Sequence, residues 1–271
     1  MRLIFIGDII GKAGRRAVHD HLPALRAAFN PDLVVMNGEN AAGGFGITEK
    51  IFDELHDAGA DVITLGNHAF DQREALVFIE RTDCLLRPVN YPAGTPGKGA
   101  GLFSTPDGQQ VLVINVMGLV MMNPLDDPFA AVERQLSACP LGVGCDAVII
   151  DLHCEATSEK MAMGHFADGR ASLVVGTHTH IPTADHQVFP AGTAYLTDAG
   201  MTASYDSIIG MDKEEPLNRF LRKIPSGRMT PATGEPTLCG VAIETDNKTG
   251  LALNISPIRI GGQLQAVLPD F

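Results

Sequence analysis

Two histidines separated by one threonine follow a short apolar run in the segment LVVGTHTH, residues 173–180. A single histidine is more often an ordinary core or surface residue than part of a site. A pair of histidines at positions i and i+2 is more informative than a single one, because on an extended segment both side chains point the same way. Neutral imidazole is also the commonest metal ligand. His178 and His180 therefore predict a metal site, provided that other segments supply further ligands.

Four other apolar runs end in residues of the same kind. They are RLIFIG before Asp8, DLVVMNG before Glu39 and Asn40, DVITLG before Asn67 and His68, and AVIIDL before His153. The candidate metal ligands are thus Asp8, Glu39, Asn40, Asn67, His153, His178 and His180. Oxygen and nitrogen donors without a thiolate suit iron, manganese or zinc. Because seven ligands exceed the needs of one ion, we expect two transition-metal ions bridged by Glu39, with iron favoured and manganese or zinc as alternatives.

Strands and helices alternate along the first 180 residues. The five apolar runs are short, continuous and β-branched, as expected of strands buried on both faces. Amphipathic patterns predict helices over 17–29 with a kink at Pro23, over 48–59 with Thr48 as N-cap, over 71–82, and over 158–169. This alternation predicts an α/β fold, in which ligands bind beyond the carboxyl ends of the strands. The polar clusters all lie at that position.

The remaining segments show weaker periodicity of apolar residues, so their secondary structure is predicted only in outline. From about Gly192 onward we expect short strands and turns, with a polar stretch around GMDKEEPLNRFLRK. Residues 89–101, rich in Gly and Pro, are expected to form a loop that lines a pocket. Since no repeat, low-complexity tract or linker divides the chain, we expect one domain over residues 1–271.

The amino-acid composition limits the kinds of molecule that the protein is expected to bind. The chain has 20 Lys and Arg against 32 Asp and Glu, a net charge of −12, which disfavours long nucleic acids and anionic membranes. The five cysteines are irregularly spaced, which predicts reduced thiols in a cytoplasmic protein. The N-terminus lacks the long apolar region of a signal peptide, and the longest apolar stretch, 111–122, is too short to span a membrane. We expect a small-molecule substrate, and self-association into a homo-oligomer stays open.

The order of these motifs resembles the calcineurin-like metallophosphoesterases, whose usual pattern is D-x-H, G-D-x-x-D, G-N-H, a later His, and G-H-x-H. Two positions depart from it, because Ile10 stands where the first His is usual and Glu39 where Asp is usual. With these departures, the chain is similar to the YmdB-type 2′,3′-cyclic-nucleotide phosphodiesterases. The segments that carry this similarity are FIGDIIGKAGR, NGENAAGGFGIT, TLGNHAFD, DLHCEATSEK, GTHTHIPTAD and TDAGMT.

The resemblance implies a four-layer α/β/β/α sandwich with two metal ions at one edge of its sheets. One ion would take Asp8, Glu39, Asn40 and His180, and the other Glu39, Asn67, His153 and His178. Asn40 would fill the place of the missing His, and His68 would be the general acid. The implied reaction is hydrolysis of 2′,3′-cyclic nucleotides to 3′-nucleotides. Two alternatives stay open: a phosphomonoesterase or nucleotidase with the same metals, and a regulatory nucleotide-binding protein with residual activity.

Several residues near the candidate ligands allow more than one interpretation. Asp71 could support the charge of His68 or cap a helix. Gly43 and Gly44, in the segment Gly43–Gly46, could admit a substrate phosphate or form a tight turn. Lys12 and Arg15 fit a solvated helix start better than a substrate contact. The carboxylates Glu155, Asp151 and Asp198 are candidates for holding the histidine ligands, with Glu155 expected beside His153.

Overall fold

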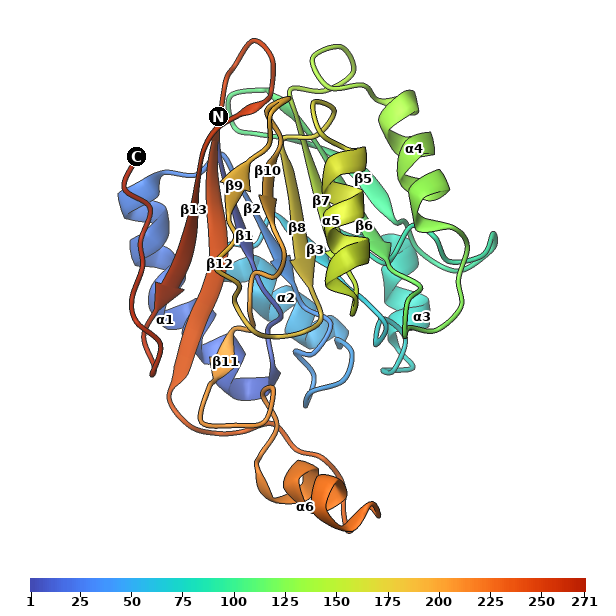
Figure 1. Ribbon diagram of the computed structural model, residues 1–271, viewed down its shortest axis with the longest axis vertical. Helices are drawn as coiled ribbons and strands as arrows, with labels where there is room; N and C mark the ends of the chain where they lie inside the picture. Colours follow the sequence, from blue (N-terminus) through green and yellow to red (C-terminus); the bar gives the residue numbers. More distant parts are fainter.

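Two β-sheets lie face to face in the computed structural model, which describes residues 1–271 (Figure 1). The first has the strand order β11-β12-β1-β2-β3-β4, with β13 paired to β12, and the second has the order β5-β6-β7-β8-β10-β9. The first sheet contains β1 (Arg2–Ile6), β2 (Leu33–Asn37), β3 (Val62–Thr64), β4 (Leu85–Leu86), β11 (Ala203–Ser204), β12 (Pro236–Thr245) and β13 (Ala252–Ile260). The second contains β5 (Ala100–Ser104), β6 (Gln110–Met117), β7 (Ala147–His153), β8 (Leu173–Thr177), β9 (Gln187–Val188) and β10 (Ala194–Leu196).

All five predicted strands are present, as β1, β2, β3, β7 and β8. Strands β1 to β4 run parallel to one another in the first sheet, and β6, β7, β8 and β10 do so in the second. Parallel strands end at the same edge of a sheet, so residues that follow them are brought together.

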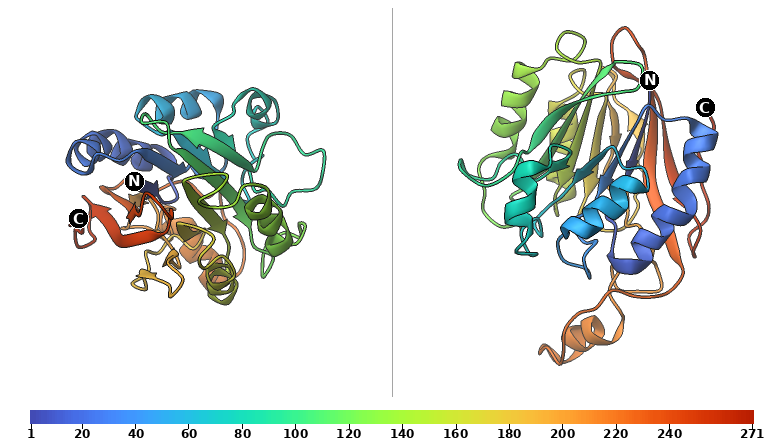
Figure 2. Two further views of the ribbon diagram at one scale, coloured as in Figure 1. Left: turned by 90° about the horizontal axis from the view of Figure 1, so that it is seen from above. Right: turned by 180° about the vertical axis from the view of Figure 1, so that it is seen from behind.

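Helices cover the outer face of each sheet. Figure 2 shows α1 (Gly11–Phe29), α2 (Glu49–Asp57) and α3 (Ala75–Phe78) over the first sheet, and Figure 1 shows α4 (Pro128–Ala138) and α5 (Thr157–Phe166) over the second. Thr48 caps α2 as expected, since its Oγ1 accepts a hydrogen bond from the amide of Ile51 at 3.3 Å. Helix α1 begins at residue 11, not 17, and continues through Pro23. The helix predicted over 71–82 is wrong at its start, because α3 begins only at residue 75 and a 3₁₀ turn (Ile79–Arg81) follows it.

Three apolar clusters explain why the strands are hydrophobic without alternation. One joins the first sheet to α1 and α2 and includes Ile4 and Leu22. The second lies between the sheets, where Phe5 and Val35 share a cluster with Val113 and Ile149. The third joins the other face of the second sheet to α4 and α5. Both faces of each central strand are therefore buried, and the predicted mixed α/β fold is confirmed.

After Gly192 the short strands β10 and β11 agree with the expectation, but the two long strands and the helix that follow them do not. β12 and β13 are the two longest strands, with 10 and 9 residues, and β12 pairs antiparallel with β1. The polar stretch after residue 210 contains the helix α6 (Glu214–Arg222), which projects from the body beyond the lower end of the sheets (Figure 1).

None of the helices combines the length and apolarity that crossing a membrane requires. All five cysteines are free thiols.

Candidate metal centre

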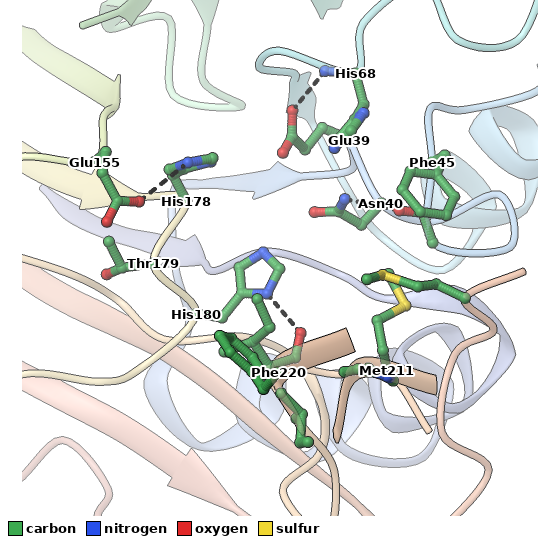
Figure 3. Close-up of a pocket in the computed structure, with 15 residues that line it drawn as sticks. Glu39, Asn40, Phe45, His68, Glu155, His178, Thr179, His180, Met211 and Phe220 are labelled. Carbon is green, nitrogen blue, oxygen red and sulfur yellow. Dashed lines mark hydrogen bonds and ion pairs between the residues drawn. The ribbon is translucent and has the colours of Figure 1, made fainter. Parts of the chain in front are cut away.

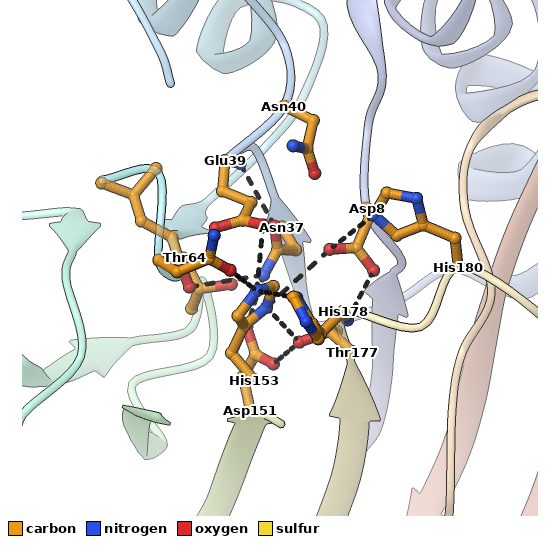
Figure 4. A network of polar contacts seen from close by, with 12 residues as sticks. Asp8, Asn37, Glu39, Asn40, Thr64, Asp151, His153, Thr177, His178 and His180 are labelled. Atoms are coloured by element: carbon orange, nitrogen blue, oxygen red, sulfur yellow. Dashed lines mark hydrogen bonds and ion pairs between the residues drawn. The ribbon is translucent and has the colours of Figure 1, made fainter. Parts of the chain in front are cut away.

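The carboxyl ends of β1, β2, β3, β7 and β8 bring the predicted ligands to one place (Figure 4). The Nε2 atom of His153 is at the centre of this cluster. It lies 2.9 Å from Glu39 Oε1, 2.9 Å from Asn67 Oδ1 and 3.0 Å from His178 Nδ1. Donor atoms about 3 Å apart match neighbouring ligands of one ion whose bonds are about 2.1 Å long. The spacing therefore fits a shared cation.

Each histidine of the cluster has one ring nitrogen turned outward to an oxygen. His153 Nδ1 lies 2.9 Å from Thr177 Oγ1, whose hydroxyl donates to Asp151 Oδ1 at 2.7 Å. His180 Nδ1 lies 2.8 Å from the carbonyl oxygen of Ile209. An oxygen acceptor at one nitrogen places the proton there and leaves a lone pair on the other. In the neutral form, each of these rings thus presents a lone pair to the centre.

The second half of the cluster is held by Asp8 and Asn40. Asp8 Oδ1 lies 4.0 Å from His180 Nε2 and is buried without a hydrogen-bond partner. Asn40 Oδ1 is buried and unpaired as well, since the amide nitrogen of Asn40 is turned away to donate to the Gly44 carbonyl at 2.9 Å. Buried acceptors without donors are costly unless something positive satisfies them. The donor set of the chain fits metal ions at both halves.

Burial and mutual contacts set the charges of the three central residues, Glu39, His153 and His178. Burial would raise the pKa of Glu39, but the charge of His153 and its hydrogen bond outweigh burial and lower that pKa to about 2. Burial lowers the pKa of His153, whereas Glu39 raises it, and the result is about 9. Burial, with His153 beside it, lowers the pKa of His178 to about 3. His178 is therefore neutral, as a metal ligand must be, whereas His153 is protonated beside Glu39, and a metal ion would have to displace that proton.

Gly66, the residue before Asn67, leaves room for this cluster. A Cβ atom at this position would overlap Glu39 Oε2 and the imidazole ring of His153. The glycine of the GNH motif is thus required by close approach of the ligands, not by its own backbone conformation.

The two histidines that first indicated a metal site do not lie on an extended segment. Strand β8 ends at Thr177, and both His178 and His180 have positive φ angles, of 90° and 68°. His178 consequently turns toward His153, and His180 toward Asp8. The expectation that both would converge on one point from an extended strand was wrong, although both join the cluster.

A buried ion pair holds this turn from behind. Lys160 Nζ donates to Asp198 Oδ2 at 2.7 Å and to the Thr177 carbonyl at 2.8 Å. Asp198 also accepts from the backbone and hydroxyl of Thr179, between the two histidines, at 3.2 and 2.6 Å. Its other oxygen accepts from the Gly200 amide at 2.8 Å. Asp198 was a candidate for this role from the sequence, whereas Lys160 was not identified.

The structure decides the contacts of two further carboxylates, Glu155 and Asp71. Glu155 contacts Nε2 of His178 at 3.3 Å and not His153, which is oriented by Thr177 and Asp151. Asp71 does not cap α3, since its Oδ2 lies 2.8 Å from Nδ1 of His68. Of its two readings, the contact with His68 is the one observed.

His68 lies at the mouth of the cluster. Its backbone amide donates to Glu39 Oε2 at 3.1 Å, and its ring meets that of Phe45 edge to face at a centroid distance of 5.1 Å. With Nδ1 facing Asp71, Nε2 is the ring atom left for another partner. A partly exposed histidine held at the rim of a ligand cluster suits proton transfer.

A cavity of about 410 Å³ opens over the cluster (Figure 3). Glu39, Asn40, His68, His178 and His180 form its polar side, and Gly44 and Phe45 lie on its wall. No residue of 89–101 lines this cavity, so that loop does not form a wall of the site. Gly43 is exposed and outside the lining, and Arg15 is engaged by Glu54 at 3.0 Å. Lys12 lines a separate hollow with Arg16.

Known proteins resemble the chain over nearly its full length. The family model of the YmdB-like proteins matches residues 4–258. The 2′,3′-cyclic-nucleotide 2′-phosphodiesterase of Bacillus subtilis is 46% identical over 260 residues, which cover 96% of this chain and 97% of the relative. The crystal structure of a hypothetical protein from Thermus thermophilus matches with a TM-score of 0.90 and 43% identity, over 97% of this chain and 100% of the other. A structure described as a novel phosphatase, from Mycoplasma pneumoniae, has a TM-score of 0.88 and 32% identity, over 96% and 93% of the two chains. By the extent of the family match and by these identities, the chain belongs to the YmdB-like protein family.

Proposed function

We propose that this protein is a cytoplasmic phosphodiesterase that hydrolyses 2′,3′-cyclic nucleotides to 3′-nucleotides with two metal ions. One observation carries the proposal: carboxylate, amide and imidazole acceptors face one another at about 3 Å, with unpaired oxygens on Asp8 and Asn40. Such a site suits cations, and two metal ions beside an open cavity are typical of phosphoester hydrolysis. The name of the Bacillus relative supports the choice of substrate.

For the division of the ligands between the two ions, we propose the one that the family resemblance implies. Glu39, Asn67, His153 and His178 would hold one ion, and Asp8, Glu39, Asn40 and His180 the other. We propose iron as the ion in the cell, with manganese or zinc as alternatives, because no thiolate is present. The three apolar clusters support a four-layer α/β/β/α sandwich in a single domain over residues 1–271.

In the reaction, the bond between phosphorus and O2′ breaks, and a water oxygen forms a new bond to phosphorus. Metal ions, when bound, would neutralise the phosphoryl oxygens and acidify the attacking water. His68 would deliver a proton to O2′ from Nε2, while Asp71 holds the ring through Nδ1. The phosphate then stays on O3′. Of the pair Gly43 and Gly44, we propose Gly44 as the substrate contact, because it lies on the cavity wall.

A phosphomonoesterase is the second candidate, favoured by the description of the Mycoplasma structure as a phosphatase. The two functions separate in one assay of 2′,3′-cyclic AMP, 3′,5′-cyclic AMP, 5′-AMP and a phosphopeptide with manganese-loaded protein. We expect 2′,3′-cyclic AMP to turn over fastest and to yield 3′-AMP on chromatography. Faster turnover of 5′-AMP or the phosphopeptide would replace the phosphodiesterase with a phosphatase. Turnover of none of them would favour a regulatory binding protein.

The number of ions is tested separately, by elemental analysis after reconstitution with excess metal and gel filtration. We expect two ions per chain. One ion or none would refute the dinuclear centre. The result of the substrate assay would not be affected.

A further inference from the structure

The cavity over the ligand cluster has an apolar side that the phosphate chemistry does not use. This side is formed by residues 206–234, here called the arm, together with Phe45 of the body. Its lining residues in the arm are Ile208, Ile209, Met211, Pro216, Phe220 and Met229. Figure 3 shows Phe220 and Met211 across the cavity from Glu39 and His178. The site therefore offers one wall to an anion and another to an apolar group.

The arm is a folded unit and not a loose loop. At its neck, the Asp212 amide donates to the Thr230 carbonyl at 2.8 Å. Within it, Glu215 accepts from the amide of Ser226 at 3.1 Å and from Arg219 Nε at 2.7 Å. The neck also contributes to the metal centre, since the Ile209 carbonyl orients His180. Phe220 is thus held at a defined place near the ligands, although 68% of it is exposed.

We propose that Phe220, with Met211 and Phe45, forms a subsite that takes the nucleobase of the substrate. This inference rests on the proposed function. A nucleobase has flat apolar faces that stack on aromatic side chains and pack against methionine. In a 2′,3′-cyclic nucleotide the base is attached to C1′, which is bonded to the carbon that carries the leaving O2′. The base must therefore lie close to His68, and Phe45 is in edge-to-face contact with that residue.

The chemistry of this wall also fixes its selectivity. The six arm residues that line it carry no polar side chain, so hydrogen bonds from them cannot distinguish one base edge from another. All four bases should be accepted, and purines should bind better because their stacking surface is larger. The wall has no basic side chain to follow a longer phosphate backbone.

The experiment compares 2′,3′-cyclic AMP with 1-O-methyl-ribofuranoside 2′,3′-cyclic phosphate, which has the same phosphate and sugar but no base. We expect Phe220→Ala to raise KM for the nucleotide about five- to twentyfold, within the range for loss of one base–aromatic contact. kcat, and KM for the base-free substrate, should stay as in the native protein. Leu221→Ala is the matched control, because Leu221 is the next residue on α6, is 74% exposed and does not line the cavity.

A second measurement does not depend on catalysis. Saturation-transfer NMR of adenosine with the metal-free protein should show binding that Phe220→Ala removes and Leu221→Ala keeps. Equal KM values for the two substrates in the native protein, or equal losses in both variants, would overturn the subsite. If no cyclic nucleotide is hydrolysed, the proposed function fails, and the adenosine experiment still decides whether the subsite exists.

Discussion

Replacement of Lys160 by Met should cost the protein a large part of its stability. Lys160 and Asp198 are both fully buried, and their charged atoms lie 2.7 Å apart. Removing one partner of a buried ion pair leaves an uncompensated charge, at a cost of about 3–5 kcal/mol. Three donors from Thr179 and Gly200 remain on Asp198, so we expect the lower end, about 3 kcal/mol. Met has a similar volume, which keeps the loss of packing small.

Urea unfolding of chelator-treated protein measures this effect, because bound metal would add its own stabilisation to the folded state. The matched control is Lys98→Met, since Lys98 and Asp83 are also 2.7 Å apart but exposed. The control should lose less than about 1 kcal/mol. The double variant Lys160→Met/Asp198→Asn should be at least about 1 kcal/mol more stable than Lys160→Met alone, because the orphaned charge is gone.

A loss below about 1 kcal/mol for Lys160→Met would refute the reasoning, because the pair would then behave like a surface ion pair. Simple addition of the two single losses in the double variant would refute it as well. The same substitution should weaken Mn²⁺ binding in calorimetry, since Asp198 holds Thr179 between two histidines with positive φ angles. Unchanged metal affinity would show that the turn keeps its shape without the lysine.

Four further substitutions test the centre itself. Glu39→Gln should lower the content of both ions in elemental analysis, whereas Asp8→Asn should lower mainly one; equal effects would contradict the bridging role of Glu39. His68→Ala should keep both ions and lower kcat by about 10²–10⁴, the usual contribution of a positioned acid. That loss should shrink for a nitrophenyl ester, whose leaving group needs little protonation, and an equal loss would point to substrate positioning. Thr177→Val should weaken Mn²⁺ binding in calorimetry about 10- to 100-fold, because the hydroxyl that orients the ring of His153 is lost. An unchanged affinity would mean that the ring needs no such support.

The sequence by itself determined which residues could meet. Each of the five predicted strands is a continuous apolar run followed by a polar residue, and parallel strands must end at a common edge. Asp8, Glu39, Asn67 and His153 follow such runs or end them, so their convergence could be predicted without coordinates. Local chemistry also sufficed for the cap of α2, where Thr48 satisfies a free amide of the first turn.

The sequence does contain a local signal for the helix α6. Leu217, Phe220, Leu221 and Ile224 recur at the spacing of one helical face, although the surrounding residues are charged. The length of β12 could similarly be predicted from the length of its apolar run. Its place beside β1 could not, because pairing between the two ends of a chain leaves no periodicity in either segment.

Only the tertiary structure decided how the ligands are oriented and what lies over them. Between His178 and His180, whose backbone is left-handed, Thr179 donates to Asp198, which comes from the start of another loop. The proton on His153 is placed by Thr177 and Asp151, which come from two neighbouring strands. Phe220 reaches the cavity because the arm folds back at its neck. A periodic pattern reports whether a residue is buried, whereas these contacts depend on distances between segments that only the packed sheets fix.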